Sequence, residues 1–216
     1  MLQAVLFRLR EGCTWRALSI FAPHTTIYTR WKQWCDSGVW DDILEALSGA
    51  AEGKLWSIDS TSCKVHKHAH GAPRSSGPQC IGSSRGGANT KVHALVDTHG
   101  NPICLSLTPG NAHDLTAAPD LVEACTSRTI LADKAYDSNA FRDLLSDLGL
   151  RACIPPKSNR IDPPKFHKGH YKRRHTVENF FQRIKELRAV ATRYEKLADR
   201  YLALVKLAAI CTWLHF

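Results

Sequence analysis

The chain has 216 residues, of which 44% are hydrophobic and 23% charged, an ordinary globular composition that excludes collagen-like, low-complexity and disordered chains. Its formal net charge is +9. The whole excess lies between Lys157 and Lys206, where there are fourteen basic and five acidic residues, whereas the rest of the chain holds fifteen of each. A basic excess confined to one stretch is typical of proteins that bind a polyanion, although a solvated basic surface gives the same pattern.

Residues 1–49 are predicted to be helical throughout. Apolar residues recur at helical spacing in residues 2–9 and Gly12 ends that segment, after which TWRALSIF gives a second short helix. Thr25 or Thr26 is expected to cap a third helix, and VWDDILEAL forms a fourth. The order resembles a helix-turn-helix unit that binds DNA, and a small helical cap without DNA contact fits the pattern equally well.

The pattern changes to strands after a linker at residues 49–53. KLWSIDST, TKVHALVDT and PICLSLTPG read as strands, and HGN joins the last two as a hairpin turn. Helices and strands then alternate through HDLTAAPDLVEAC, RTILAD, SNAFRDLLSDLGL and RACIP, and a long helix begins at about Tyr171. This order predicts an α/β fold in residues 54–216, with a mixed sheet flanked by helices. Residues 1–49 would form a separate all-helical region.

The eight cysteines contain no CxxC pair and indicate reduced thiols rather than a disulfide framework. The N-terminus lacks the basic and apolar regions of a signal peptide. Three charged residues interrupt the apolar run at 197–216, so a buried helix is favoured over a membrane span. The sequence therefore predicts a soluble, cytoplasmic protein without a membrane partner.

Two aspartates lie at positions where the structure of a strand gives no reason for a carboxylate. Asp59 follows the apolar run LWSI and Asp133 follows TILA, so each lies near the end of a short buried strand. An ionised carboxylate without a partner is costly in such surroundings. Each aspartate alone could cap a turn, but two on separate strands favour a shared site.

A third carboxylate lies in the segment YKRRHTVENFFQRIKELR. At about 100° per residue, Tyr171, Arg174, Glu178 and Lys185 fall in one helical stripe about 60° wide, beside an apolar face. A solvated charged face is the alternative. Three converging carboxylates form an oxygen-rich site suited to Mg²⁺ or Mn²⁺, and two such ions can activate a water or a 3′-hydroxyl at a phosphodiester. With basic residues to hold phosphates, the pattern predicts phosphoryl transfer on nucleic acid.

The sequence resembles the DDE transposases of bacterial insertion sequences, in family five, from residue 1 to 216. The resemblance rests on SIDST, SRGGANTKVHALVD, LTPGNAHD, LADKAYDS, IPPKSNR and YKRRHTVENFFQRIKELRAVATRYEKLA. The last segment contains the Y-x2-R-x3-E-x6-K signature as Tyr171, Arg174, Glu178 and Lys185. Family members usually carry additional residues before MLQAVLFRLREG, so a full-length copy and an N-terminally truncated copy both stay open.

The resemblance implies a ribonuclease-H-like fold and a catalytic, metal-binding triad of Asp59, Asp133 and Glu178. It implies cleavage of DNA at the ends of an insertion sequence and strand transfer into target DNA, with Mg²⁺ as cofactor and Mn²⁺ able to substitute. The implied partner is double-stranded DNA, both the terminal inverted repeats and the target, bound by a homodimer in the nucleoid. The expected DNA-binding residues are Tyr171, Arg174, Lys185, Lys134 and Arg188.

Other interpretations of the same residues stay open. A truncated derivative could act as a DNA-binding repressor, and a ribonuclease-H-like nuclease could cut without joining. Cys63, His66, His68 and His70 could form a zinc cluster, but their spacing matches no common structural zinc pattern; on a continuing strand the histidines would share one side. Asp137 is either the cap of the helix that follows or the runner-up for the second metal ligand. Asp97 and Asp114 are expected to stabilise a turn and to cap a helix, respectively.

Overall fold

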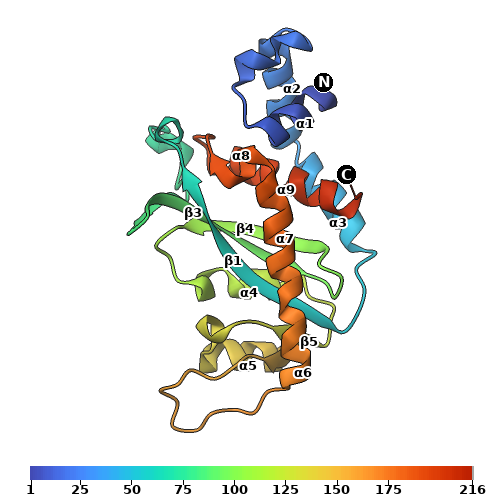
Figure 1. Cartoon of the computed structure of the whole chain (residues 1–216), viewed down its shortest axis with the longest axis vertical. Coiled ribbons are helices and arrows are strands. Elements are labelled where there is room, and N and C mark those ends of the chain that lie inside the picture. Colours follow the sequence, from blue (N-terminus) through green and yellow to red (C-terminus); the bar gives the residue numbers. More distant parts are fainter. Residues whose placement is uncertain (216) are drawn as a thin grey trace.

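A computed structural model describes residues 1–215, so Phe216, the end of the predicted 54–216 region, lies outside the described residues (Figure 1). The α-helices are α1 (Leu2–Glu11), α2 (His24–Asp36), α3 (Val39–Ser48), α4 (Ala118–Glu123), α5 (Asn139–Asp147), α6 (Lys168–Tyr171), α7 (His175–Glu186), α8 (Arg188–Ala191) and α9 (Ala198–Trp213). The strands are β1 (Leu55–Val65), β2 (Gly82–Ser84), β3 (Gly87–Val96), β4 (Pro102–Pro109), β5 (Thr129–Leu131), β6 (Arg151–Cys153) and β7 (Thr192–Arg193). Short 3-10 turns, labelled η, connect several of them.

The strands form one mixed sheet with β1 at its centre. On one side β1 pairs antiparallel with β3, which pairs antiparallel with β4. On the other side β1 pairs parallel with β5, and β5 pairs parallel with β6. An antiparallel unit extended by parallel strands, with helices on both faces, is the ribonuclease-H-like arrangement, and the predicted fold class is confirmed.

The predicted hairpin between β3 and β4 is present, and Asp97 stabilises its turn. The Asp97 side chain accepts hydrogen bonds from the backbone N–H groups of His99 and Asn101, each at 2.8 Å. Gly100 adopts φ +86°, a left-handed conformation that glycine reaches at little cost. The turn role expected of Asp97 is confirmed.

The two faces of the sheet bury two separate hydrophobic cores. Trp56 and Ile58 of β1 lie in the core with α4 and α5. Cys63 lies in the other core, with α7, α9 and the N-terminal helices. Because side chains alternate along a strand, Asp59 lies on the α7 face and Ser60 on the α4 face.

The N-terminal segment is helical as predicted, and it shares the core of α7 and α9. α3 packs against α9, and Trp31 and Ile27 of α2 are fully buried. The expected threonine cap is wrong, because α2 begins at His24 after Pro23 and no side chain caps it. A proline has no N–H and its φ is already helical, so it can begin a helix ahead of Thr25.

The long helix predicted from Tyr171 is interrupted. α6 ends at Tyr171, the 3-10 turn η6 covers Lys172–Arg174, and α7 begins only at His175. Lys168 and Lys172, four residues apart, carry like charges that disfavour a regular α-helical turn, and Arg174 is drawn to a carboxylate on β1. Figure 1 shows α7 running along β1 towards α8.

The C-terminal segment forms the buried helix α9 that was predicted. Its side chains from Tyr201 to Ile210 are largely enclosed, because sheet, α3 and α7 contact it on several sides. In the part of the chain that the structure describes, no helix is long and apolar enough to cross a membrane.

The sequence did not predict β2, β7 or α8, and β7 carries a fully buried arginine. The Arg193 guanidinium donates to the backbone oxygens of Gln79, Glu195 and Lys196, and to the hydroxyl oxygen of Thr90 at 2.8 Å. It also lies over the ring of Tyr201, 5.3 Å from the ring centroid. Arg193 therefore holds three separate segments of the chain together.

Candidate active site

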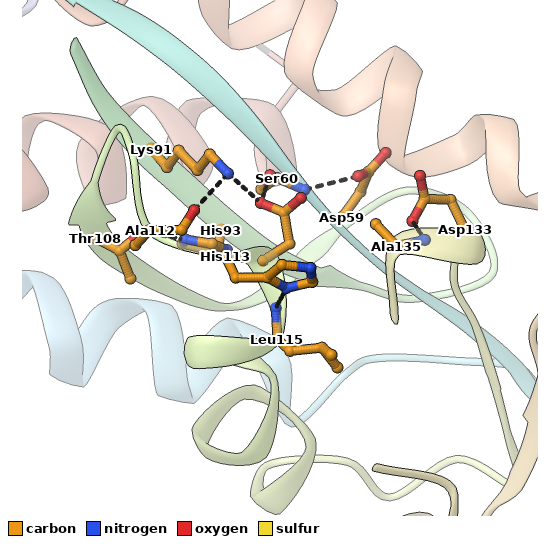
Figure 2. A network of polar contacts seen from close by, with 11 residues as sticks. Asp59, Ser60, Lys91, His93, Thr108, Ala112, His113, Leu115, Asp133 and Ala135 are labelled. Atoms are coloured by element: carbon orange, nitrogen blue, oxygen red, sulfur yellow. Dashed lines mark hydrogen bonds and ion pairs between the residues drawn. The ribbon is translucent and has the colours of Figure 1, made fainter. Parts of the chain in front are cut away.

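Asp59 and Asp133 lie beside one another at the centre of the sheet. β1 and β5 run parallel with Ser57 opposite Leu131. Asp59 and Asp133, each two residues further along, therefore lie opposite one another. β5 ends at Leu131 and Asp133 begins the turn η5 (Lys134–Tyr136), whereas β1 continues. Figure 2 shows the two side chains next to each other. The parallel register is therefore what pairs the two aspartates.

Both aspartates are held in place by backbone groups. Asp59 Oδ1 accepts from the N–H of Ser60 at 2.8 Å, and Asp133 Oδ1 accepts from the N–H of Ala135 at 2.8 Å. Burial raises the pKa of Asp59, and the negative charge of Asp133 raises it further. A buried carboxylate whose charge is disfavoured, next to a second carboxylate, forms a place that attracts a cation.

Arg174 supplies a cation there and joins Asp59 to Glu178. Its guanidinium donates to Asp59 Oδ2 at 2.6 Å and pairs with Glu178, one turn further along the chain. Burial alone would lower the pKa of Arg174. The negative charges of Asp59 and Glu178 outweigh this effect, so the pKa of Arg174 is raised. The Glu178 side chain is 46% exposed, at the edge of the apolar face of α7.

The three predicted triad residues therefore come into one region, with a guanidinium between two of them. Within residues 1–215 no group of three His, Cys, Asp or Glu side chains is arranged to hold a metal ion. The donor set is nevertheless suited to a divalent cation, because its oxygens are hard ligands and two of its carboxylates already bind a cation. A metal ion bound by Asp59 and Glu178 would compete with the Arg174 guanidinium for their oxygens.

The predicted DNA-binding residues do not all lie together. The Lys185 ammonium donates to Thr61 Oγ1 at 2.5 Å and to the Ser62 backbone oxygen at 3.1 Å, so it lies on β1 beyond Asp59. The ring of Tyr171 lies 5.9 Å from the guanidinium carbon of Arg174. Lys134 is exposed directly after Asp133, and Arg188 is exposed at the start of α8.

A second polar cluster lies on the opposite face of β1, and the sequence did not single it out (Figure 2). Ser60 Oγ donates to Asp114 Oδ1 at 2.6 Å, and the Lys91 ammonium donates to the same oxygen at 2.8 Å. The cap expected of Asp114 is wrong, because His113 Nδ1 accepts from the N–H of Leu115 instead. Lys91 of β3 points to the face that the Asp114 turn covers, and its place in the alternating strand TKVHALV was the one signal for this contact.

Tyr136 is fully buried between these two groups. Its hydroxyl has no hydrogen-bond partner among the described residues. Burial, followed by the charges of Asp59, Asp114 and Asp133, raises the pKa of Tyr136 well above its ordinary value. Its hydroxyl is therefore a proton-bearing donor close to the carboxylates.

His93 is a buried neutral imidazole in the same cluster. Its Nε2 lies 2.7 Å from the Thr108 hydroxyl, and Nδ1 has no partner among the described residues. Burial lowers the pKa of His93 to about 4, and the nearby cation Lys91 acts in the same direction while Asp114 opposes it.

We expect His93 to make the protein sensitive to acid. The unfolded chain binds a proton at this imidazole below about pH 6.5, whereas the folded chain does so only below about pH 4. The free energy of unfolding should therefore fall as the pH is lowered through this interval, by up to about 3 kcal/mol from this group. Urea unfolding at several pH values should show a smaller fall in His93→Gln than in the unmodified chain. Replacing the exposed His113 in the same way should leave the fall unchanged, and an equal fall in His93→Gln would contradict the assignment.

Asp137 is neither a helix cap nor a free metal ligand. Ser138 caps α5, and the buried Asp137 carboxylate pairs with Arg142 at 2.8 Å and Arg160 at 2.6 Å and accepts from the N–H of Lys157. Burial alone would raise the pKa of Asp137, but these donors outweigh it and lower the pKa well below its usual range. Asp137 therefore fastens the loop that follows β6 to α5.

Cys63 of β1 and the three histidines that follow the strand do not form one cluster. Cys63 is buried in the α7 core beside Tyr201, and burial raises the pKa of its thiol. β1 ends at Val65, and Lys67–Ala69 form a 3-10 turn, so the histidines do not share one side of a strand as expected. His66 instead packs between His68 and Tyr194.

Both the N-terminal helical segment and the remainder of the chain resemble families of known proteins. The family described as "Transposase DDE domain" matches residues 52–214, and the one described as "Putative transposase of IS4/5 family" matches residues 1–44. The putative transposase for insertion sequence element IS6501 of Brucella ovis is 35% identical over 128 residues, which are 58% of this chain and 98% of that protein. The putative transposase for element IS402 of Burkholderia cepacia is 28% identical over 149 residues, 63% of this chain and 67% of that protein. The catalytic core domain of BIV integrase aligns over 72% of this chain and 84% of its own, with 17% identity and a TM-score of 0.41.

Proposed function

Because the chain belongs to the family of transposase DDE domains, it is a DNA transposase, and we propose that Asp59, Asp133 and Glu178 are its catalytic carboxylates. The observation that carries this proposal is the binding of one guanidinium by Asp59 and Glu178, beside Asp133. Carboxylates brought together by β1, the end of β5 and α7 favour a cation between them.

The family depends on divalent metal ions, and we propose Mg²⁺, with Mn²⁺ able to substitute, held by Asp59, Asp133 and Glu178. Ions held by these residues would supply the chemistry that activates a water or 3′-hydroxyl and stabilises the departing oxygen of a phosphodiester. The protein orients the two aspartates through the backbone N–H groups of Ser60 and Ala135. Release of Arg174 from Asp59 makes its guanidinium available to a DNA phosphate.

The DNA is proposed to lie along α7 and the stretch of β1 between its pairings with β5 and β7, residues 58–63. Tyr171, Arg174 and Lys185 follow one another in that direction, with Lys134 beside Asp133 and Arg188 at the far end. Residues 1–49 would form a DNA-binding helical region and residues 54–216 the catalytic domain. The proposed substrates are the terminal inverted repeats and target DNA, bound by a homodimer in the cytoplasm at the nucleoid.

We expect the protein to nick a duplex that carries the inverted repeats flanking its coding frame, and only with a divalent metal. Chelation should remove the activity, and Mg²⁺ or Mn²⁺ should restore it. Affinity for the same duplex should fall steeply as salt rises, because every phosphate contact releases counterions. Metal-independent nicking, or an affinity that salt does not change, would contradict the proposal.

Two alternative functions give different results in that assay. A DNA-binding repressor would bind the duplex with the same dependence on salt and would not nick it. A ribonuclease-H-like nuclease would nick the repeat but would not join its 3′ end to a second DNA, so a strand-transfer assay with a labelled end separates the two.

A further inference from the structure

We propose that a groove beyond the end of β1 binds one nucleotide displaced from the DNA duplex. This aromatic groove lies between the N-terminal helices, the turn after β1 and the segment after β7. Its volume is about 600 Å³, and its lining includes Trp15, Arg16, Tyr28, His68, Tyr194 and Lys196. The inference rests on the proposed function, because it assigns a second contact to the same DNA.

The lining rings come from three segments that are distant in the sequence. Trp15 and Tyr28 meet edge to face, with centroids 5.2 Å apart, on the N-terminal side. Tyr194 and His68 line the other side. The ring of His66, which is not part of the lining, packs against both, with centroid distances of 4.8 Å to Tyr194 and 4.5 Å to His68. The backbone N–H of His66 donates to the Arg193 oxygen, which fixes the turn after β1 to the end of β7. Tyr28 and Tyr194 stay 41% and 37% exposed, so they remain able to stack on a ligand.

The charge of the groove favours a phosphate. Arg16 and Lys196 are exposed on its lining, which contains one carboxylate, Glu195, among the described residues. Arg8 neutralises that carboxylate with an ion pair at 2.5 Å, and the Arg8 guanidinium also lies 4.3 Å from the ring of Trp15. Two further nitrogens of Arg8 have no hydrogen-bond partner among the described residues.

The size of the groove decides between a duplex and a single nucleotide. Its volume lies in the range of pockets that enclose small ligands, about 300–1,000 Å³, which is too narrow for a double helix. Aromatic side chains next to cations are the usual platform for an unpaired base and its phosphate. The occupant that fits both the size and the chemistry is a nucleotide that has left the stack.

The position of the groove matches DNA held at the proposed catalytic site. Val65, the last residue of β1, follows Asp59 by six residues, which corresponds to about 20 Å of strand. Stacked DNA advances about 3.4 Å per base pair, so a duplex running along β1 reaches the groove about six base pairs from the cleaved phosphate. Figure 1 shows the N-terminal helices beyond the end of α7, on the side of α8.

The test uses a duplex that carries the flanking inverted repeat, with a single mismatch moved along it. A mismatched base leaves the stack more easily, so the unmodified protein should bind most tightly when the mismatch is about six base pairs from the cleaved phosphate. Tyr194→Ala should lose about tenfold in affinity and the preference for that mismatch, as expected when one stacked base is lost. Tyr194→Phe should retain both, because its ring is kept.

Two controls separate this inference from the proposed function. Arg16→Ala should weaken binding of the same duplex, whereas Arg151→Ala, which removes another exposed arginine on β6, should not. A shorter duplex that ends before the groove should be nicked equally by Tyr194→Ala and by the unmodified protein. Equal affinity for matched and mismatched DNA at every position, or an unchanged preference in Tyr194→Ala, would overturn the inference. Failure to nick either duplex would instead count against the proposed function.

Discussion

Replacing Asp59 with asparagine is expected to abolish DNA cleavage and leave the protein folded. The amide retains the shape of the side chain but removes a negative charge from the pair with Asp133, so the site loses its attraction for a divalent cation. Loss of one electrostatic group at a reacting centre typically costs about 10²–10³-fold in rate, and a metal ligand should cost at least as much. The measurement is single-turnover nicking of the inverted-repeat duplex with Mg²⁺.

Stability separates a catalytic effect from an unfolding effect in this experiment. Because burial and Asp133 disfavour the charge of Asp59, the neutral asparagine should not lower the free energy of unfolding by more than the lost ion pair with Arg174 contributes. Glu186→Gln is the matched control, since Glu186 is an exposed carboxylate on the same helix as Glu178. Cleavage by Asp59→Asn at the unmodified rate would remove Asp59 from the proposed triad.

Replacing Arg193 with methionine should destabilise the protein by at least about 3 kcal/mol. The change takes the donor from the buried Thr90 hydroxyl and from three backbone oxygens around the buried Arg193 side chain. Each buried polar group without a partner costs about 1–3 kcal/mol, and relief from burying the cation offsets only part of this. In a chain of this size the loss should lower the melting temperature by about 6–12 °C, measured by calorimetry.

Arg128→Met provides the comparison for Arg193, because Arg128 is exposed just before β5. It should change the melting temperature by no more than a surface substitution usually does, within about 0.5 kcal/mol. A similar small change in Arg193→Met would mean that water can replace the guanidinium, and that Arg193 does not hold the three segments together.

Most of the sheet and the positions of the two aspartates could be predicted from the sequence. Alternating apolar residues mark β3 and β4, and HGN marks their turn, because these signals are local. Asp59 and Asp133 were recognised as partners because each follows an apolar run, and the parallel pairing of β1 with β5 then brings them level. These predictions needed no knowledge of distant contacts.

The other features depend on contacts that no local pattern encodes. Helical periodicity places Arg174 beside Glu178, four residues further on, but the contact of Arg174 with Asp59 depends on how this helix packs across β1. Asp114 was expected to cap a helix, but Lys91 and Ser60, distant in the sequence, bind it instead. The two-residue strand β7 exists only because β1 offers it an edge. Such features follow from the tertiary structure.

The core that α1–α3 share with α9 has a consequence for the order in which the protein can fold. Residues of the N-terminal helices and of α9 bury each other in one core. Because α9 is the last helix of the chain, the N-terminal helices leave the ribosome well before the helix that covers them. At about 5–20 residues per second, the intervening chain takes about 10–30 s to synthesise. During that time the apolar faces of α2 and α3 remain open to chaperones or to a second nascent chain. The native structure can therefore form only after synthesis is nearly complete, and contacts so distant in sequence form slowly.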